Sequence, residues 1–235
     1  MTFSDNYCSI LSSVGLEEYS GKEFAEKFEI FFRMLVEENG KYNLTSITEE
    51  NEVILRHFAD SLTAVKRING KTVTDVGCGG GFPCIPISII LPELKIFAID
   101  STSKKLGFIN KVAERIGLNV ETVSARAEDL ARDTQYRESF DTVISRAVAR
   151  MNVLCELTLP LTKVGGKFIA MKGPDGITEL NEAENAVSVL GGKVSEIREF
   201  TLSDAGKRTV VEITKERHTP DFYPRPFAKI KKKPL

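Results

Sequence analysis

The chain has 235 residues, of which 42% are hydrophobic and 28% are charged, and its formal net charge is −1. This composition predicts a globular protein with one sizeable core, and no apolar run approaches the roughly 18 residues that a membrane-spanning helix requires. The four cysteines show no paired spacing, so we expect a reduced, cytoplasmic setting with neither a disulfide framework nor a metal site. Residues 215–235 hold seven Lys and Arg against two acids, which indicates a polyanionic partner that is contacted locally.

Residues 1–70 are expected to form a helical extension that packs on the core. Residues 1–20 predict only a short helix or a loose end. Apolar residues from Phe24 to Val36 recur at helical spacing, and Asn39-Gly40 is expected to end this amphipathic helix. A second helix is expected to begin with Thr48 as its N-cap and to bury an apolar stripe from Ile54 to Ile68.

One side of this second helix carries His57, Asp60 and Ser61 at the spacing i, i+3 and i+4. A lone helical histidine with an aspartate nearby most often forms a local hydrogen-bonded pair. The other interpretation is that the three side chains face a cofactor or a target. The sequence alone leaves both interpretations open.

Residues 71–215 alternate between strand and helix patterns. Strands are predicted at residues 73–76, 94–100, 120–123, 140–144, 167–171, 194–202 and 209–214, and the main helices at 82–91, 103–117 and 177–190. Alternation of this kind predicts an α/β, Rossmann-like, doubly wound sheet that is mostly parallel. The last two strands are joined by a short turn, so we expect them to form an antiparallel edge.

A glycine-rich turn, Gly77-x-Gly79-x-Gly81, joins the first strand to the following helix. Such a turn is expected to leave a row of backbone N–H groups uncovered, against which a ligand can lie. Asp100 ends the next strand about twenty residues on, the spacing at which a carboxylate reaches ribose hydroxyls. Asp75, at the end of the first strand, would repel a pyrophosphate but accept a hydrogen bond from an ammonium group. The two acids therefore favour S-adenosylmethionine over NAD.

The residues that end the predicted strands are expected to meet on one rim, because ligands of such sheets bind beyond the carboxyl ends of the strands. These residues are Gly77, Asp100, Ala127-Glu128, Ser145-Arg146 and Lys172.

Five motifs stand out: Asn43-Leu44-Thr45, His57-x-x-Asp60-Ser61-Leu62, Asp75-Val76-Gly77-x-Gly79-x-Gly81-Phe82-Pro83-x-Ile85-Pro86, Ser145-Arg146-Ala147 and Tyr223-Pro224-Arg225. Together they resemble the ribosomal RNA small-subunit methyltransferase G family, also called glucose-inhibited division protein B. The resemblance covers nearly the whole chain from Asn43 onward. It implies a class I S-adenosylmethionine-dependent methyltransferase that methylates N7 of one guanine in small-subunit (16S) ribosomal RNA.

Carried over by position, the resemblance implies a set of donor-binding residues: Gly77, Phe82, Ala127, Glu128 and Arg146, with Asp100 on the ribose. The glycine turn itself adds Gly79. Cys78 and Cys84 stand where members of the family often have another small residue, which is a sterically mild difference.

The implied chemistry needs no general base, because guanine N7 already offers an in-plane lone pair. The protein then has to align the nucleophile, the methyl group and the sulfur. We therefore expect no dedicated catalytic residue, and we name Arg146 and Lys172 as candidates for contacts to RNA phosphate or to the carboxylate of the donor.

Residues 216–235 are expected to form a basic tail that contacts RNA. The RNA-binding candidates are His57, Lys172, Arg225, Lys231, Lys232 and Lys233. We expect a monomer whose partner is small-subunit ribosomal RNA or the ribosomal subunit. The alternatives are a methyltransferase of a small molecule, a nucleotide- or RNA-binding module without catalysis, and an NAD oxidoreductase.

Overall fold

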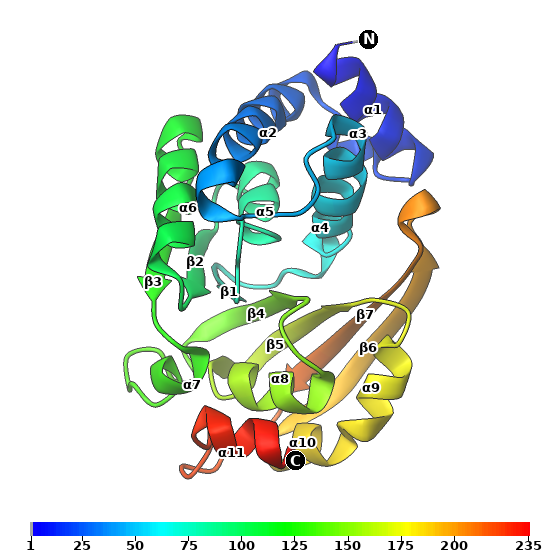
Figure 1. Ribbon diagram of the computed structural model, residues 1–235. Coiled ribbons are helices and arrows are strands. Elements are labelled where there is room, and N and C mark those ends of the chain that lie inside the picture. The colour runs from blue at the N-terminus through cyan, green and yellow to red at the C-terminus, as the bar shows by residue number, and fades with distance from the viewer. Residues whose placement is uncertain (1) are drawn as a thin grey trace.

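A computed structural model describes residues 2–235, and within that range it contains one seven-stranded sheet with the strand order β3-β2-β1-β4-β5-β7-β6 (Figure 1). The strands are β1 (Thr72–Val76), β2 (Lys95–Asp100), β3 (Val120–Ser124), β4 (Phe140–Arg146), β5 (Thr162–Lys172), β6 (Gly192–Thr201) and β7 (Lys207–Lys215). Strands β1 to β5 are parallel, whereas β7 pairs antiparallel with both β5 and β6. The prediction of a doubly wound sheet with an antiparallel edge is confirmed.

Helices cover both faces of the sheet because the strand residues alternate between two apolar clusters. On β4, Ile144 belongs to the cluster under α2 (Lys22–Tyr42), α5 (Cys84–Ile90) and α6 (Ser103–Ile116). Its neighbour Val143 belongs to the cluster under the other helices. These are α7 (Ala127–Leu130), α8 (Met151–Thr158), α9 (Gly176–Glu182), α10 (Glu184–Val189) and α11 (Phe227–Lys232). Figure 1 shows the first group above the sheet and the second group below it.

The chain before residue 70 is helical throughout most of its length. Its elements are α1 (Phe3–Ser13), η1 (Glu17–Tyr19), α2, α3 (Glu50–Val53), η2 (Ile54–Ala59), α4 (Asp60–Leu62) and η3 (Val65–Arg67). The start of the chain is an ordered helix, because Thr2 and Asp5 form a reciprocal capping box at its N-terminus. Segment η2 is a π-helix inserted between α3 and α4.

Two predicted helix boundaries in this region were wrong. Helix α2 does not end at Asn39-Gly40 but continues to Tyr42, where Asn43 takes the left-handed conformation with φ 50°. The Asn39 side chain instead holds the following loop, since its Oδ1 accepts from the N–H groups of Leu44 and Thr45 at 2.9 Å. Glu49 rather than Thr48 is the N-cap of α3 and accepts from Glu52 N.

An aromatic cluster joins these helices to the sheet. The ring of Phe31 lies 5.4 Å from that of Phe58 and 5.2 Å from that of Phe82, and Phe108 of α6 packs on it at 6.2 Å. The apolar stripe of α2 is therefore core, as predicted, although Val36 at its end is 41% exposed. One continuous apolar cluster thus includes residues from both sides of residue 70.

The C-terminal half differs from prediction in two places. Strand β5 begins at Thr162 instead of residue 167, and the predicted helix 177–190 is two short helices that meet at Ala183. The tail packs on the domain, because Arg225 forms a two-pronged ion pair with the buried Glu156 and α11 packs under α8. In Figure 1 the N-terminus and the C-terminus lie at opposite ends of the molecule.

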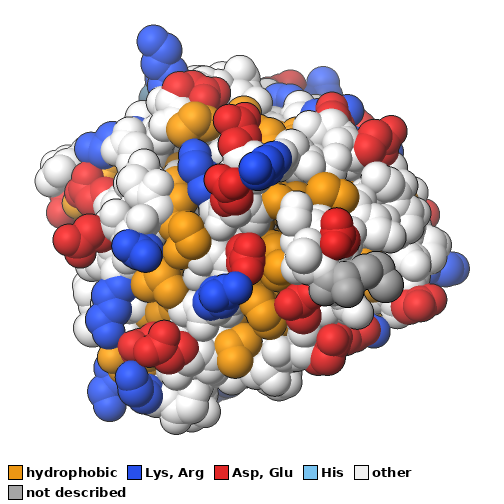
Figure 2. Space-filling model, turned by 90° about the horizontal axis from the view of Figure 1, so that it is seen from above, with side chains coloured by type: hydrophobic (Ala, Val, Ile, Leu, Met, Phe, Trp, Pro, Cys, Tyr) orange, Lys and Arg blue, Asp and Glu red, His pale blue; other side chains and the backbone are white. Residues whose placement is uncertain are grey.

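Residues 2–235 contain no helix that is both long and apolar enough to cross a membrane. Over the same residues, no group of three or more His, Cys, Asp or Glu side chains is arranged to hold a metal ion. Viewed from above the N-terminal helices, acidic and basic side chains are interspersed around patches of hydrophobic atoms (Figure 2).

Candidate functional site: a cleft at the carboxyl ends of the strands

A cleft of about 950 Å³ lies where the parallel strands end. The loops after β1, β2, β3, β4 and β5 line it, together with part of the N-terminal helices and the β6–β7 hairpin. All the strand-end residues predicted to share a rim, except Ser145, line this cleft. Ser145 is buried and donates to the carbonyl of Val76.

The glycine turn forms one wall of the cleft. Gly77, Gly79 and Gly81 have φ values of +77°, +54° and +94°, a region that residues with a Cβ rarely adopt. A Cβ on Gly77 would come within 2.4 Å of the Val148 side chain, and one on Gly81 within 2.8 Å of Ile85. Gly77 and Gly81 are therefore required both by conformation and by space.

The expectation of a row of free N–H groups on this turn was wrong. The N–H groups of Gly77 and Cys78 both donate to the carbonyl of Ile99, and those of Gly81 and Phe82 to the carbonyl of Cys78. Gly79 N donates to Asp100 Oδ2 at 3.1 Å. The turn thus offers a smooth surface rather than an anion-binding nest, which suits a ligand without phosphate.

Asp100 lines the cleft at the end of β2, where its carboxylate is held in place by the backbone. Oδ2 accepts from Gly79 N, and Oδ1 accepts from Thr102 N at 2.8 Å. Both oxygens keep lone pairs that can accept from a hydroxyl group. Ala127 and the buried Glu128 line the cleft after β3, where Glu128 is 3.9 Å from the Arg126 guanidinium.

Asp75 does not face the cleft, contrary to its predicted role as an acceptor for an ammonium group. Its side chain is fully buried under the turn, where Oδ2 accepts from Cys84 N at 3.1 Å at the start of α5. Burial raises the pKa of Asp75 to about 7, and its Oδ1 has no hydrogen-bond partner within residues 2–235. Asp75 therefore supports the turn from below and does not touch a ligand.

Phe82 and His57 form a stacked pair in the cleft, with ring centroids 4.4 Å apart. Burial and the nearby Arg146 lower the pKa of His57 to about 4, so the imidazole is neutral at pH 7. Its Nε2 lies 2.7 Å from Thr45 Oγ1. Of the predicted trio, His57 and Asp60 line the cleft, whereas Ser61 is buried and donates to the carbonyl of His57.

Asp60 connects two arginines that are far apart in the sequence. Its Oδ2 accepts from Arg146 Nη1 at 2.9 Å, and its Oδ1 accepts from Arg208 Nε at 2.8 Å. The Arg146 guanidinium also lies over the Phe82 ring, 5.3 Å from its centroid. The start of α4, the end of β4 and the β6–β7 hairpin are therefore fastened together along one wall of the cleft.

Lys172 ends β5 and is almost fully buried at the same wall. Its Nζ pairs with Glu179 Oε2 at 2.7 Å and donates to the carbonyl of Ala149. The same Glu179 oxygen accepts from Met151 N at 2.9 Å. Lys172 is thus a fixed, paired cation rather than a mobile one.

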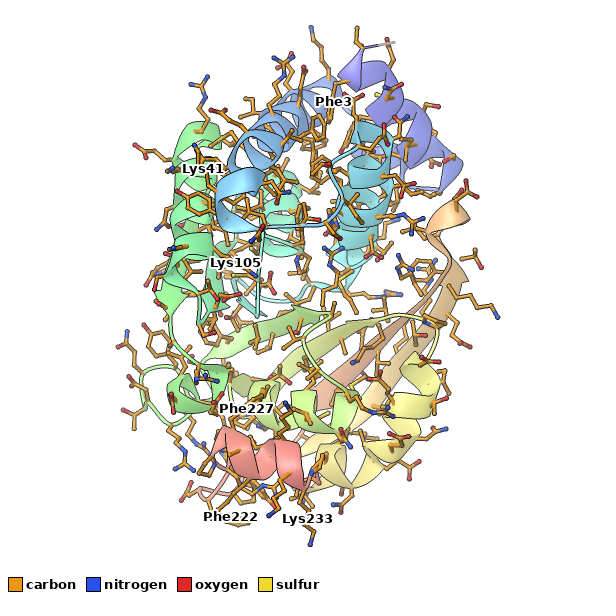
Figure 3. All side chains as sticks on the ribbon, in the orientation of Figure 1. Phe3, Lys41, Lys105, Phe222, Phe227 and Lys233 are labelled. Carbon is orange, nitrogen blue, oxygen red and sulfur yellow. The ribbon has the colours of Figure 1, made fainter. Side chains whose placement is uncertain are left out.

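The predicted RNA-binding residues separate into two groups. His57 and Lys172 line the cleft, but among the described residues no side chain after Val210 does so. Arg225 is paired with Glu156, and its contact with RNA stays a prediction. Lys231, Lys232 and Lys233 lie on and just after α11, and Figure 3 shows Lys233 and Phe222 at the edge of the molecule, away from Lys105 beside the cleft.

Sequence reasoning missed several cleft residues, namely Lys105, Arg126, Glu179 and Arg208. Lys105 and Arg126 lie close to predicted strand ends, and this position could have placed them in the cleft from sequence. Arg208 and Glu179 have no such signal, because each reaches the cleft through an ion pair with a residue on another element.

The doubly wound sheet, the glycine turn after β1 and the acid at the end of β2 define a class I S-adenosylmethionine-dependent methyltransferase. Two solved methyltransferases share the fold. A mutant of the 16S rRNA (adenine(1408)-N(1))-methyltransferase from Catenulisporales acidiphilia has a TM-score of 0.54 at 13% identity, over 68% of this chain and 92% of that one. The ribosomal protein L11 methylase from Lactobacillus delbrueckii subsp. bulgaricus has a TM-score of 0.51 at 16% identity, over 69% and 79%.

The chain belongs to the GidB family of rRNA small subunit methyltransferase G, which residues 24–211 match. The ribosomal RNA small subunit methyltransferase G of Desulfitobacterium hafniense (strain Y51) is 47% identical, over 93% of this chain and 92% of its own. That of Brevibacillus brevis (strain 47 / JCM 6285 / NBRC 100599) is 44% identical over 98% of each chain.

Proposed function

We propose that the protein transfers the methyl group of S-adenosylmethionine to N7 of a guanine in small-subunit ribosomal RNA. The observation that carries the proposal is the division of the cleft. A smooth glycine wall and Asp100 lie over β1 to β3, and a wall of fixed cations, Arg146, Lys172 and Arg208, lies over β4 to β7. The names of the relatives support an RNA substrate.

The donor would be held by seven residues of the first half and its border: Gly77, Gly79, Phe82, Asp100, Ala127, Glu128 and Arg146. The cleft fits such a ligand, since its volume suits a molecule of that size and glycines form part of its wall. When bound, S-adenosylmethionine supplies a methyl group on a positively charged sulfur. Asp100 keeps free lone pairs for ribose hydroxyls.

The residues at the border perform no proton transfer in this proposal. Guanine N7 attacks with its own lone pair, and the neutral His57 stacked on Phe82 fixes the shape of the cleft. Arg146 and Lys172 are the candidates for contacts near the reacting atoms, as hydrogen-bond donors to the base or to phosphate. Because each is already paired with a carboxylate, it keeps its position when no RNA is bound.

The proposed partner is small-subunit ribosomal RNA, alone or within the subunit, and we propose that a monomer acts on it in the cytoplasm. Residues 71–215 would be the catalytic part, residues 1–70 the helical extension and residues 216–235 a basic segment. Lys231, Lys232 and Lys233 would add phosphate contacts outside the cleft.

The test is methyl transfer to ribosomal RNA from cells that lack the protein. With labelled S-adenosylmethionine, we expect one guanine of the small-subunit RNA to gain an N7 methyl group, located by mass mapping of RNA fragments. Calorimetry with S-adenosylhomocysteine should show binding. A binding module without catalysis would also bind it, but would transfer no methyl group to RNA. Methylation of no RNA nucleotide would overturn the proposal.

A small-molecule methyltransferase would have no use for the basic segment. Replacing Lys231, Lys232 and Lys233 with Gln should weaken RNA methylation and lower its salt dependence, with donor affinity unchanged. The control is Lys22→Gln, which removes an exposed lysine at the start of α2. Equal methylation of RNA by the triple variant and the wild type would contradict the role of the segment.

A further inference from the structure

A guanine offers a fixed order of hydrogen-bonding groups that a protein can read. Beside the N7 and O6 acceptors, it carries the N1–H donor next to O6, whereas adenine carries a donor at N6 and an acceptor at N1. A site that selects guanine therefore needs a donor and an acceptor side by side. The second half of the cleft has to supply both, if guanine binds there as proposed above.

Two carboxylates are available on that side. In residues 2–235 the acids that line the cleft are Asp60, Asp100, Glu128 and Glu179, and of these Asp100 and Glu128 follow β2 and β3 on the donor side. Asp60 has each oxygen bonded to an arginine. Asp60 is therefore already neutralised and poorly placed to accept from a base.

Glu179 is different, because only one of its oxygens is used. Oε2 accepts from Lys172 Nζ and from Met151 N, while no hydrogen bond within the described chain reaches Oε1. The side chain is 19% exposed, and Oε1 is not among the buried polar atoms without a partner, so it is open to solvent in the cleft. One acceptor is thus left free on a carboxylate that two bonds hold in place.

Lys172 supplies the matching donor. An ammonium group has three N–H bonds, and Nζ uses one on Glu179 Oε2 and another on the carbonyl of Ala149. One N–H of Nζ is thus left without an acceptor among residues 2–235. The free N–H and the free oxygen belong to one ion pair, and O6 and N1–H of guanine require such a donor and such an acceptor, in the order that adenine reverses.

From this geometry we infer that the Lys172–Glu179 pair selects guanine as the target base. Lys172 Nζ donates to O6, and Glu179 Oε1 accepts from N1–H. This inference rests on the proposed function, of which it names the specificity-determining residues. Glu179 touches the base and takes no part in the transfer of the methyl group.

The experiment compares small-subunit RNA that carries either guanine or 2,6-diaminopurine at the position that mass mapping identifies. Diaminopurine keeps N7 but has an amine in place of O6 and an acceptor at N1. For the wild type, we expect kcat/KM to be at least about tenfold higher with guanine. In Glu179→Gln the amide nitrogen can donate to N1 of diaminopurine but cannot accept from N1–H of guanine. Guanine methylation should therefore fall about tenfold, and the preference for guanine should shrink toward parity.

The matched control is Glu182→Gln on the same helix, which removes an exposed partner of Arg150 and should leave both the rate and the preference unchanged. Donor affinity by calorimetry shows whether Glu179→Gln is folded. If Glu179 had only a structural role, Glu179→Gln would lower kcat/KM for both substrates by the same factor and keep the wild-type preference. That result would overturn the inference.

A wild type without preference between the two bases also overturns the inference, and needs no variant. If the wild type methylated no guanine at N7, the proposed function itself would fail. If it methylated guanine at N7 but its preference did not depend on Glu179, only this inference would fail.

Discussion

The two halves of the cleft are built by different means. On the side of β1 to β3 the wall includes the main chain of a turn that three glycines with positive φ shape. On the side of β4 to β7 it is a set of ion pairs, in which Asp60 meets Arg208 across 148 residues of sequence. The first half owes its shape to one short contiguous stretch, and the second exists only when distant elements are brought together by folding.

Because of this difference, the two halves should tolerate different kinds of substitution. A backbone wall fails when a side chain is added, because both the conformation and the space are lost. A wall of ion pairs fails when one partner is removed, because the other is left buried without a counter-charge. Variants of the two halves should therefore differ in whether they affect donor binding or RNA methylation.

The largest effect is expected for Gly77→Val. The positive φ and the Cβ position 2.4 Å from Val148 both oppose a branched side chain, so donor affinity should fall at least about 100-fold, or about 3 kcal/mol. Calorimetry with S-adenosylhomocysteine measures it. Gly107→Val is the control, because its Cβ would meet no atom within 4 Å. Retained donor binding in Gly77→Val would contradict the placement of the donor on this turn.

Asp60→Asn tests the opposite half. Loss of the charge leaves Arg146 and Arg208 without their shared partner, so the free energy of unfolding should fall by about 3 kcal/mol, measured in urea. RNA methylation should fall more than donor affinity. Glu121→Gln, which breaks the exposed pair with Lys95, should change stability by less than about 0.5 kcal/mol. Equal losses of donor affinity and of RNA methylation in Asp60→Asn would contradict the division of the cleft into two halves.

A smaller effect is expected for Asp100→Ala. The variant removes the acceptor of Gly79 N and the carboxylate proposed for the ribose, so donor affinity should fall about 30-fold, or about 2 kcal/mol. The control Asp129→Ala changes an exposed acid of α7 that does not line the cleft. An unchanged donor affinity in Asp100→Ala would rule out its ribose contact.

A change in the pH dependence of stability, rather than a loss at one pH, is expected for Asp75→Asn. The pKa of Asp75 is raised from its ordinary value of 3.8 to about 7 by burial, so between these pH values the folded state keeps a proton that the unfolded state has lost. Stability contributed by this group therefore falls as the pH rises from about 4 to about 7, by at most about 1.4 kcal/mol per pH unit. Chemical unfolding of the variant across this range should lack that loss, and identical slopes would contradict the buried, protonated state.

The sheet and the donor half can be predicted from sequence because both depend on local patterns. Strand ends converge by topology, and this alone predicts that Gly77, Asp100, Glu128 and Arg146 share one cleft with the residue that ends β5. The direction of a side chain at a strand end follows from packing instead. The sequence therefore suggests a place in the cleft for Asp75. In the structure its side chain instead lies under the glycine turn and accepts from Cys84 N at the start of α5.

The second half cannot be predicted in the same way, since an ion pair leaves no trace in either partner's local sequence. Arg225 belongs to a basic stretch, and only the fold reveals that it is paired with the buried Glu156. Glu179 likewise follows β5 in an ordinary helical pattern. Its free oxygen becomes visible only once Lys172 and Met151 are seen on the other one.

The aromatic cluster that joins the N-terminal helices to the sheet has a consequence for synthesis on the ribosome. Phe28, Phe31 and Phe58 are translated first, but their partners Phe82 and Phe108 follow up to some eighty residues later. At roughly 5–20 residues per second, Phe31 waits several seconds for its contacts with Phe82 and Phe108. The N-terminal segment therefore completes its aromatic packing only after Phe82 and Phe108 have been made.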